Sequence, residues 1–115
     1  MEINRSDVGN VTVLRLSGDM VDEAGIDPLR EHLLECWRHN RVQLVLNLSE
    51  VGVMSYMGLG IFVDWLRKIR ASHGDMKLVG ANVYFERTMR MMGMKALFET
   101  FDAENTAVSF FHEAA

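Results

Sequence analysis

The sequence has very little of the residues that divide a chain into segments or staple it together. Its 115 residues include one proline, Pro28, and one cysteine, Cys36, and no block rich in Gly and Ser. A lone cysteine cannot form a disulfide within the chain, and an unpaired thiol without a CxxC motif favours a reducing compartment. Because the length is also close to the commonest domain size, we expect a single cytoplasmic domain over residues 1–115.

Long apolar runs and an excess of positive charge are missing as well. No uninterrupted stretch reaches the ~18 apolar residues that a membrane helix needs. Residues 1–7 lack the basic start and apolar continuation of a secretory signal. The formal net charge is −4, and the Lys and Arg residues are scattered. Since nucleic acids are usually bound by clustered basic side chains, we expect no nucleic-acid binding. The lack of a long apolar run predicts that the chain has no transmembrane segment.

Motifs that support catalysis or metal binding are also absent from the sequence. It contains no GxGxxG, no GxxxxGK[ST] and no GxSxG. None of the four histidines stands at metal-ligand spacing from another His, a Cys or paired carboxylates. Cys36 lies on an apolar stripe beside Trp37, which favours a core side chain over a nucleophile. We therefore expect no enzyme activity, no cofactor and no metal site.

Strand-like segments are the first regular feature that the sequence does contain. Residues 1–5 and 11–16, with turn residues between them, predict an N-terminal antiparallel hairpin. The almost continuous apolar run 42–48 predicts a central strand that is buried on both faces. Short strands are expected at residues 76–79 and 97–101.

Helix-like segments alternate with these strands. Asp27 and Pro28 predict the start of the first helix, because Asp caps free N–H groups and Pro is tolerated at the first helical position. Three more helices are expected at residues 58–71, 83–92 and 105–112, with Gly93 as a left-handed cap of the third. The fold class is therefore α/β, with a mixed, mostly parallel sheet covered by about four helices.

The most informative part of the chain is the stretch in which the central strand is expected to end, a loop to follow and the second helix to begin near Gly58. Ser55 stands just before the expected helix start, and Gly58 and Gly60 fall in its first turn. Two interpretations stay open. Ser55 could cap the helix while the glycines allow tight packing on the sheet. Alternatively, the helix N-terminus could receive an anion such as a phosphate on a nearby hydroxyl.

The second helix also carries apolar residues outside its expected core stripe. That stripe consists of Leu59, Phe62, Val63, Leu66 and Ile69. Met57, Ile61 and Trp65 lie away from it on a helical wheel and form a candidate interaction ridge. The alternative is that the third helix or the last helix covers the ridge. With Met54, Tyr56 and Gly58, these residues make up the predicted partner-binding surface.

The order and spacing of several motifs resemble the STAS domain family, and most of all bacterial anti-sigma-factor antagonists. The central match is the strand at residues 44–48 followed by Val51, Met54 and the triplet Gly58-Leu59-Gly60. Three weaker matches, which cover most of the remaining chain, lie at residues 16–20, 74–79 and 92–98. The resemblance implies a STAS-like fold over nearly the whole chain.

The resemblance also implies a function in regulation. In such antagonists a serine just before Gly-Leu-Gly is phosphorylated by a partner kinase that also holds a sigma factor. The unphosphorylated antagonist binds this kinase and frees sigma. The family pattern is Asp-Ser-Ser/Thr-Gly-Leu, whereas this chain has Ser55 in the place of the aspartate and Tyr56 in that of the phosphorylated serine. The standard serine switch is therefore not expected here.

The partner implied by the resemblance is an anti-sigma factor or another serine-kinase-type protein, and a homodimer is possible. STAS domains also serve as accessory subunits of lipid-transporting ABC systems and as parts of stress-signalling scaffolds. These two functions stand as alternatives to the antagonist function.

Overall fold

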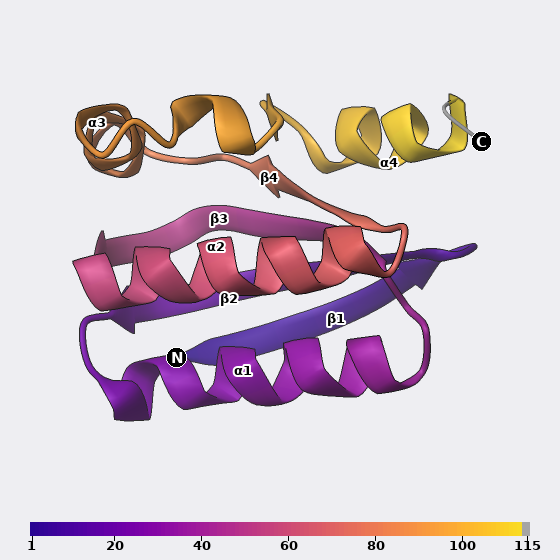
Figure 1. Ribbon diagram of the computed structural model, residues 1–115, viewed down its shortest axis with the longest axis horizontal. Helices are drawn as coiled ribbons and strands as arrows, with labels where there is room; N and C mark the ends of the chain where they lie inside the picture. Colours follow the sequence, from indigo (N-terminus) through magenta and orange to yellow (C-terminus); the bar gives the residue numbers. More distant parts are fainter. Residues whose placement is uncertain (114–115) are drawn as a thin grey trace.

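The computed structural model describes residues 1–113, which form a five-stranded sheet in the order β1-β2-β3-β4-β5. β1 (Glu2–Val8) and β2 (Val11–Met20) pair antiparallel. The remaining neighbours pair in parallel: β2 with β3 (Gln43–Met54), β3 with β4 (Asp75–Val79), and β4 with β5 (Thr100–Phe101). The predicted mixed sheet with an N-terminal hairpin is confirmed (Figure 1).

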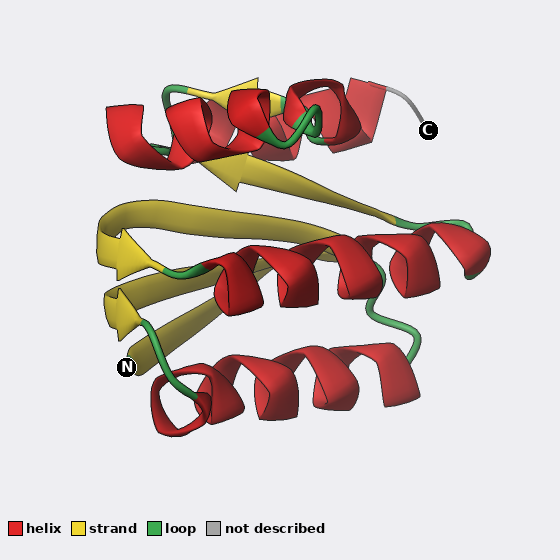
Figure 2. Cartoon of the chain, turned by 60° about the vertical axis from the view of Figure 1, so that its left-hand side comes forward, coloured by secondary structure: helices red, strands yellow, loops and turns green. Residues whose placement is uncertain are grey.

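Helices lie on both faces of this sheet. α1 (Glu23–Arg38) and α2 (Tyr56–Ala71) run side by side across one face, as Figures 1 and 2 show. α3 (Val83–Met91) and a short 3-10 turn, η1 (Lys95–Leu97), follow β4, and α4 (Glu104–Glu113) covers the other face. Four helices of residues 1–113 thus cover the sheet, in agreement with the sequence.

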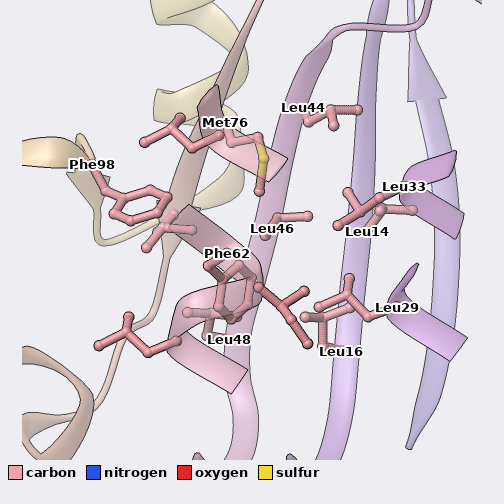
Figure 3. Packing of buried hydrophobic residues seen from close by; sticks show 14 of the residues in the cluster. Leu14, Leu16, Leu29, Leu33, Leu44, Leu46, Leu48, Phe62, Met76 and Phe98 are labelled. Atoms are coloured by element: carbon pink, nitrogen blue, oxygen red, sulfur yellow. The ribbon is translucent and has the colours of Figure 1, made fainter. Parts of the chain in front are cut away.

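The main core fills the space between the sheet and helices α1, α2 and α3. Alternate residues of β2 and β3 contribute leucines to it, which pack against leucines of α1 (Figure 3). Phe62 of α2 stands at its centre, fully buried, with edge-to-face contacts to Phe85 and Phe98 at ring-centroid distances of 6.1 and 6.5 Å. These contacts hold α3 and the following segment against the middle of α2, because edge-to-face aromatic pairs stabilise packing beyond the burial of their apolar area.

A smaller core lies on the opposite face, under α4. Valines of β2, β3 and β4 meet the apolar side of the helix there, namely Ala107, Val108 and Phe111. Beyond the end of this core, Arg15 donates two hydrogen bonds to the carboxylate of Glu104, at 2.8 and 2.7 Å. Asn47 donates a third to the same carboxylate at 2.7 Å. This polar cluster ties the start of α4 to the middle of the sheet.

The predicted start of the first helix is wrong by five residues. α1 begins at Glu23, and Asp22 caps it by accepting a hydrogen bond from the N–H of Gly25 at 2.8 Å. Asp27 and Pro28 lie inside the helix. The physical reason is that Ile26 is fully buried in the core, which makes the extra turn favourable.

The central strand is also longer than the sequence indicated. The prediction ended it at Leu48, but β3 continues to Met54 alongside an equally extended β2. Twice, β3 advances by three residues while β2 advances by two, at the register pairs Arg15↔Asn47 to Ser17↔Glu50 and Gly18↔Val51 to Met20↔Met54. Such β-bulges keep the strands paired while bending one of them. The expected loop before α2 is therefore a bulged strand.

Candidate functional site

Ser55 joins the end of β3 to the start of α2. Its N–H donates to the carbonyl of Met20 at 2.9 Å, which fixes it to the end of β2. Its Oγ accepts a hydrogen bond from the N–H of Gly58 at 3.3 Å, and its backbone is extended, as expected of an N-cap. The capping interpretation of Ser55 is therefore confirmed, and Tyr56 becomes the first residue of the helix.

The two glycines of the first turn of α2 differ in their surroundings. A Cβ on Gly58 would lie 3.0 Å from Cγ of Met54 and 3.2 Å from the carbonyl oxygen of Met20. Gly58 therefore lets the helix start pack closely against the strand ends. A Cβ on Gly60 would meet nothing within 4 Å among residues 1–113, so the packing explanation applies to Gly58 and not to Gly60.

Large apolar side chains are exposed around this helix start. They come from the ends of β2 and β3 and from the first turns of α2 and α3, at Val21, Val53, Tyr56, Met57, Val83 and Tyr84. Tyr84 is 71% exposed and Tyr56 66%. We call these six residues the carboxyl-end face, because the parallel strands end there, toward the left of Figure 1. Clustered exposed apolar residues of this kind mark interaction sites.

The predicted partner-binding residues do not all reach this face. Tyr56 and Met57 do, and Met54 lies partly buried beside them. Gly58 is buried beneath. Ile61 is 8% exposed and belongs to the main core, so its predicted position off the core stripe is wrong. A helix that packs on a sheet beside another helix buries more than one narrow stripe of its surface, and α2 lies beside α1.

Trp65 is partly buried and lies between α1 and α2, where it packs against the core. The ammonium of Lys68 lies 4.8 Å from its ring centroid and 5.0 Å from that of Trp37, a cation–π arrangement. Eight residues of helix separate Trp65 from Met57, about 12 Å along the axis. Trp65 therefore belongs to a different part of the surface from the carboxyl-end face.

The electrostatics of the helix starts set α2 apart. Helices α1, α3 and α4 each carry an acidic residue in the first turn, Glu23, Glu86 and Glu104 respectively, whereas α2 has none. The partial positive charge of its N-terminus is therefore not offset from within its own first turn. Nearby, Asp19 of β2 accepts a hydrogen bond from the N–H of Val53 at 2.9 Å and holds the end of β3 in place.

A cavity of about 250 Å³ opens beside the helix start. Its walls come from the last part of β3, from Leu59 of α2 and from the first turns of α3, where Asn82, Tyr84, Phe85 and Thr88 contribute. Asn82 caps α3 through the N–H of Phe85 at 2.9 Å. Its amide also donates to the carbonyls of Val51 and Gly52, each at 3.3 Å, which joins α3 to the end of β3.

Sequence reasoning missed Val53 and Asn82-Val83-Tyr84 as parts of this region. A signal was present, because residues 82–84 follow the strand that neighbours β3. In a parallel sheet the residues after adjacent strands meet at the same edge, which is where α/β proteins bind ligands. Val53 was hidden by the incorrect prediction that its segment is a loop.

A family comparison decides the relationship of the chain. The model of the STAS domain matches residues 2–107. The chain belongs to the STAS domain family. A comparison with curated protein sequences gave no match.

Solved structures of STAS proteins have the same fold. The anti-sigma factor antagonist SpoIIAA in its unphosphorylated form superposes with a TM-score of 0.77 at 17% identity, over 96% of this chain and 98% of that one. An anti-sigma factor antagonist from Mycobacterium paratuberculosis gives 0.80 at 20% identity, over 94% and 91%. A variant of RsbS from Moorella thermoacetica gives 0.81 at 15% identity, over 99% and 97%. Identities this low support likeness of fold alone.

Three further observations concern the length of the helices, the grouping of possible metal ligands and the one cysteine. No helix of residues 1–113 is long and apolar enough to cross a membrane. Within the same residues, no three His, Cys, Asp or Glu side chains are grouped so that they could hold a metal ion. Cys36 is fully buried, and burial raises the pKa of its thiol, which makes it a poor nucleophile.

Proposed function

We propose that this STAS domain is a cytoplasmic regulatory module of the anti-sigma-factor antagonist type, which works by docking and not by catalysis. The carboxyl-end face is its docking surface. The partner is an anti-sigma factor or another protein with a serine-kinase-type nucleotide fold, and docking releases a sigma factor from it. The single observation that carries the proposal is the group of six exposed apolar side chains around the start of α2.

The composition of the face supports docking. Tyrosine and methionine are enriched in the centres of protein interfaces, where aromatic anchors can each cost ~2 kcal/mol or more when truncated. Tyr56 and Tyr84 are the largest side chains of the face and are both mostly exposed in the monomer. All six side chains of the face are uncharged, so the face itself offers apolar contact, and the carboxylate of Asp19 lies beside it at Val53.

The test is a binding titration against the anti-sigma-type kinase encoded in the same genome. Tyr56→Ala and Tyr84→Ala should each weaken binding about tenfold or more while the thermal unfolding midpoint stays close to that of the parent. Val8→Ala is the control. Val8 is an exposed apolar residue at the hairpin between β1 and β2, away from the carboxyl ends of the parallel strands. Equal affinity of all variants would exclude the carboxyl-end face as the docking surface.

Trp65→Ala tests whether docking is confined to the carboxyl-end face or also uses the ridge along α2 that the sequence suggested. If docking is confined to the carboxyl-end face, Trp65→Ala lowers the stability of the fold and leaves the affinity per folded molecule unchanged. A loss of affinity without a loss of stability would instead extend the interface along α2 to the junction with α1.

A further inference from the structure

The cavity beside the start of α2 has the form of a small-molecule site. Such sites are concave and mostly apolar, with a few polar groups in the wall. Here a space of about 250 Å³ remains between β3, α2 and α3, next to the tightly packed Phe62 and Phe85. Two of its lining residues, Val53 and Tyr84, are strongly exposed, so the cavity opens to solvent at the carboxyl-end face.

Two of the three polar side chains in the cavity wall, Asn82 and Thr88, are already engaged within the protein, and the third, Tyr84, is largely exposed. The Oδ1 of Asn82 accepts from the N–H of Phe85, and its Nδ2 donates to the carbonyls of Val51 and Gly52. The hydroxyl of Thr88 donates to the carbonyl of Tyr84 at 2.9 Å. No residue that lines the cavity carries a charge. An ion would therefore lose its hydration without compensation, whereas a neutral apolar molecule would not.

The volume restricts the size of the occupant. A dry apolar cavity of about 150 Å³ in another protein accepts benzene. A cavity of about 250 Å³ has room for a bicyclic aromatic or an alicyclic molecule of about ten non-hydrogen atoms. The walls suit such a ligand, since Leu48, Leu59 and Phe85 supply apolar surface and Met54 supplies a flexible thioether that adapts its shape.

We propose that this cavity binds a small, neutral, apolar molecule, with a bicyclic aromatic as the best fit. The inference goes beyond the docking function and does not depend on it, because the ligand binds to the domain without a partner. Val53 and Tyr84 belong both to the cavity wall and to the carboxyl-end face, so the ligand would sit directly beside the docking surface.

Methionine methyl groups provide a site-specific test. The domain is labelled with 13C at its methionine methyls and titrated with indole, a neutral bicyclic aromatic that dissolves at millimolar concentration. The methyl signal of Met54 should shift and saturate, because Met54 lines the cavity. Met76 in the core and Met91, which is 74% exposed on α3, should not shift.

A cavity-filling variant provides the control for location. Thr88→Leu enlarges a side chain of the wall and should weaken indole binding about tenfold or more, since overpacked sites reject added volume. Thr106→Leu makes the same change at an exposed position of α4 and should leave binding unchanged. If Thr88→Leu does not fold, Val53→Trp at the exposed mouth should have the same effect as Thr88→Leu.

Three results would overturn the inference. One is the absence of a saturable shift at Met54. Another is a set of equal, non-saturating shifts at Met57, Met91 and Met92, which would indicate adsorption to exposed apolar surface. The third is that indole does not bind while Thr88→Leu weakens partner docking, which would assign the cavity to a side chain of the partner protein.

Discussion

The Oγ of Ser55 lies 3.3 Å from the backbone nitrogen of Gly58, and this hydrogen bond caps α2 at the point where β3 ends. The same serine is bound through its own N–H to Met20 of β2. The hydroxyl at this position is therefore part of the scaffold that holds the carboxyl-end face. Removal of this hydroxyl would first lower the stability of α2.

Replacement of Ser55 by alanine should lower the free energy of unfolding by about 1 kcal/mol, the usual cost of losing an N-cap. Ser55→Asp should retain most of the stability, because aspartate caps as well as serine does. Urea unfolding followed by circular dichroism measures both. Ser109→Ala, at an exposed position of α4, serves as control. Equal stability of Ser55→Ala and the parent would show that the cap contributes nothing.

Gly60→Ala should stabilise the domain by roughly 0.5–1 kcal/mol, because alanine is the better helix former and its Cβ would meet no atom within 4 Å among the described residues. Gly58→Ala, two positions earlier, should destabilise it, since its Cβ would approach Met54 and Met20. Thermal unfolding of the pair is the measurement. A stabilised Gly60→Ala that binds the partner more weakly would indicate that the partner approaches the helix backbone there.

The Arg15–Glu104 pair should make stability depend on pH in the acid range. The hydrogen bonds from Arg15 are the largest cause that holds the pKa of Glu104 below its ordinary value of 4.5. The hydrogen bond from Asn47 lowers this pKa further, and burial opposes both. A lowered pKa in the folded state stabilises the fold above pH 4.5, and this stabilisation is lost as the pH falls through the folded pKa.

Glu104→Gln should therefore cost about 1 kcal/mol near neutral pH, a modest amount because Arg15 is 41% exposed and solvent screens the pair. The difference from the parent should shrink toward zero below pH 4. Unfolding by urea at a series of pH values tests this, with Glu113→Gln on the exposed end of α4 as control. A difference that does not change with pH would mean that the loss comes from packing.

Phosphorylation by a serine kinase of the anti-sigma type should be absent at the start of α2. The hydroxyl of Tyr56 lies several ångströms further from the backbone than that of a serine, and a displacement of ~1 Å already impairs catalysis. Ser55 is occupied as a cap. Incubation with the kinase and ATP, followed by mass spectrometry of the peptide 51–67, is the measurement. Stoichiometric phosphate on Ser55 or Tyr56 with loss of docking would contradict the prediction.

Local sequence signals sufficed for those features whose causes are local. The β-branched and apolar residues at 11–16 and the apolar run 42–48 predicted strands correctly, because strands buried in a sheet are rich in such residues. The capping position of Ser55 and the left-handed Gly93, with φ of 68°, were also predictable from residue type.

Features that depend on distant partners were not predictable in the same way. The bulged end of β3 exists because β2 extends beside it, and the burial of Ile61 depends on its place among the packed helices of the main core. The cavity requires Asn82 and Thr88 to meet Val51 and Leu59, which lie more than twenty positions earlier. The hydrophobic periodicity of one segment carries no information on contacts between segments that are distant in the sequence.

The two bulges of β3 determine how the chain can change its length near the site. Core-facing positions follow one another as Leu44, Leu46, Leu48, then Val51, then Met54, in step with those of β2. Deletion of the extra residue from either bulge would return that segment to regular alternation and leave every later side chain of the strand on its present face, beside the same residue of β2. Deletion of one residue from the regular part of β3 would instead turn every later side chain to the opposite face, since neighbours alternate. Length variation among related chains is therefore expected at the two bulges, in steps of one residue, and not in the regular part of the strand.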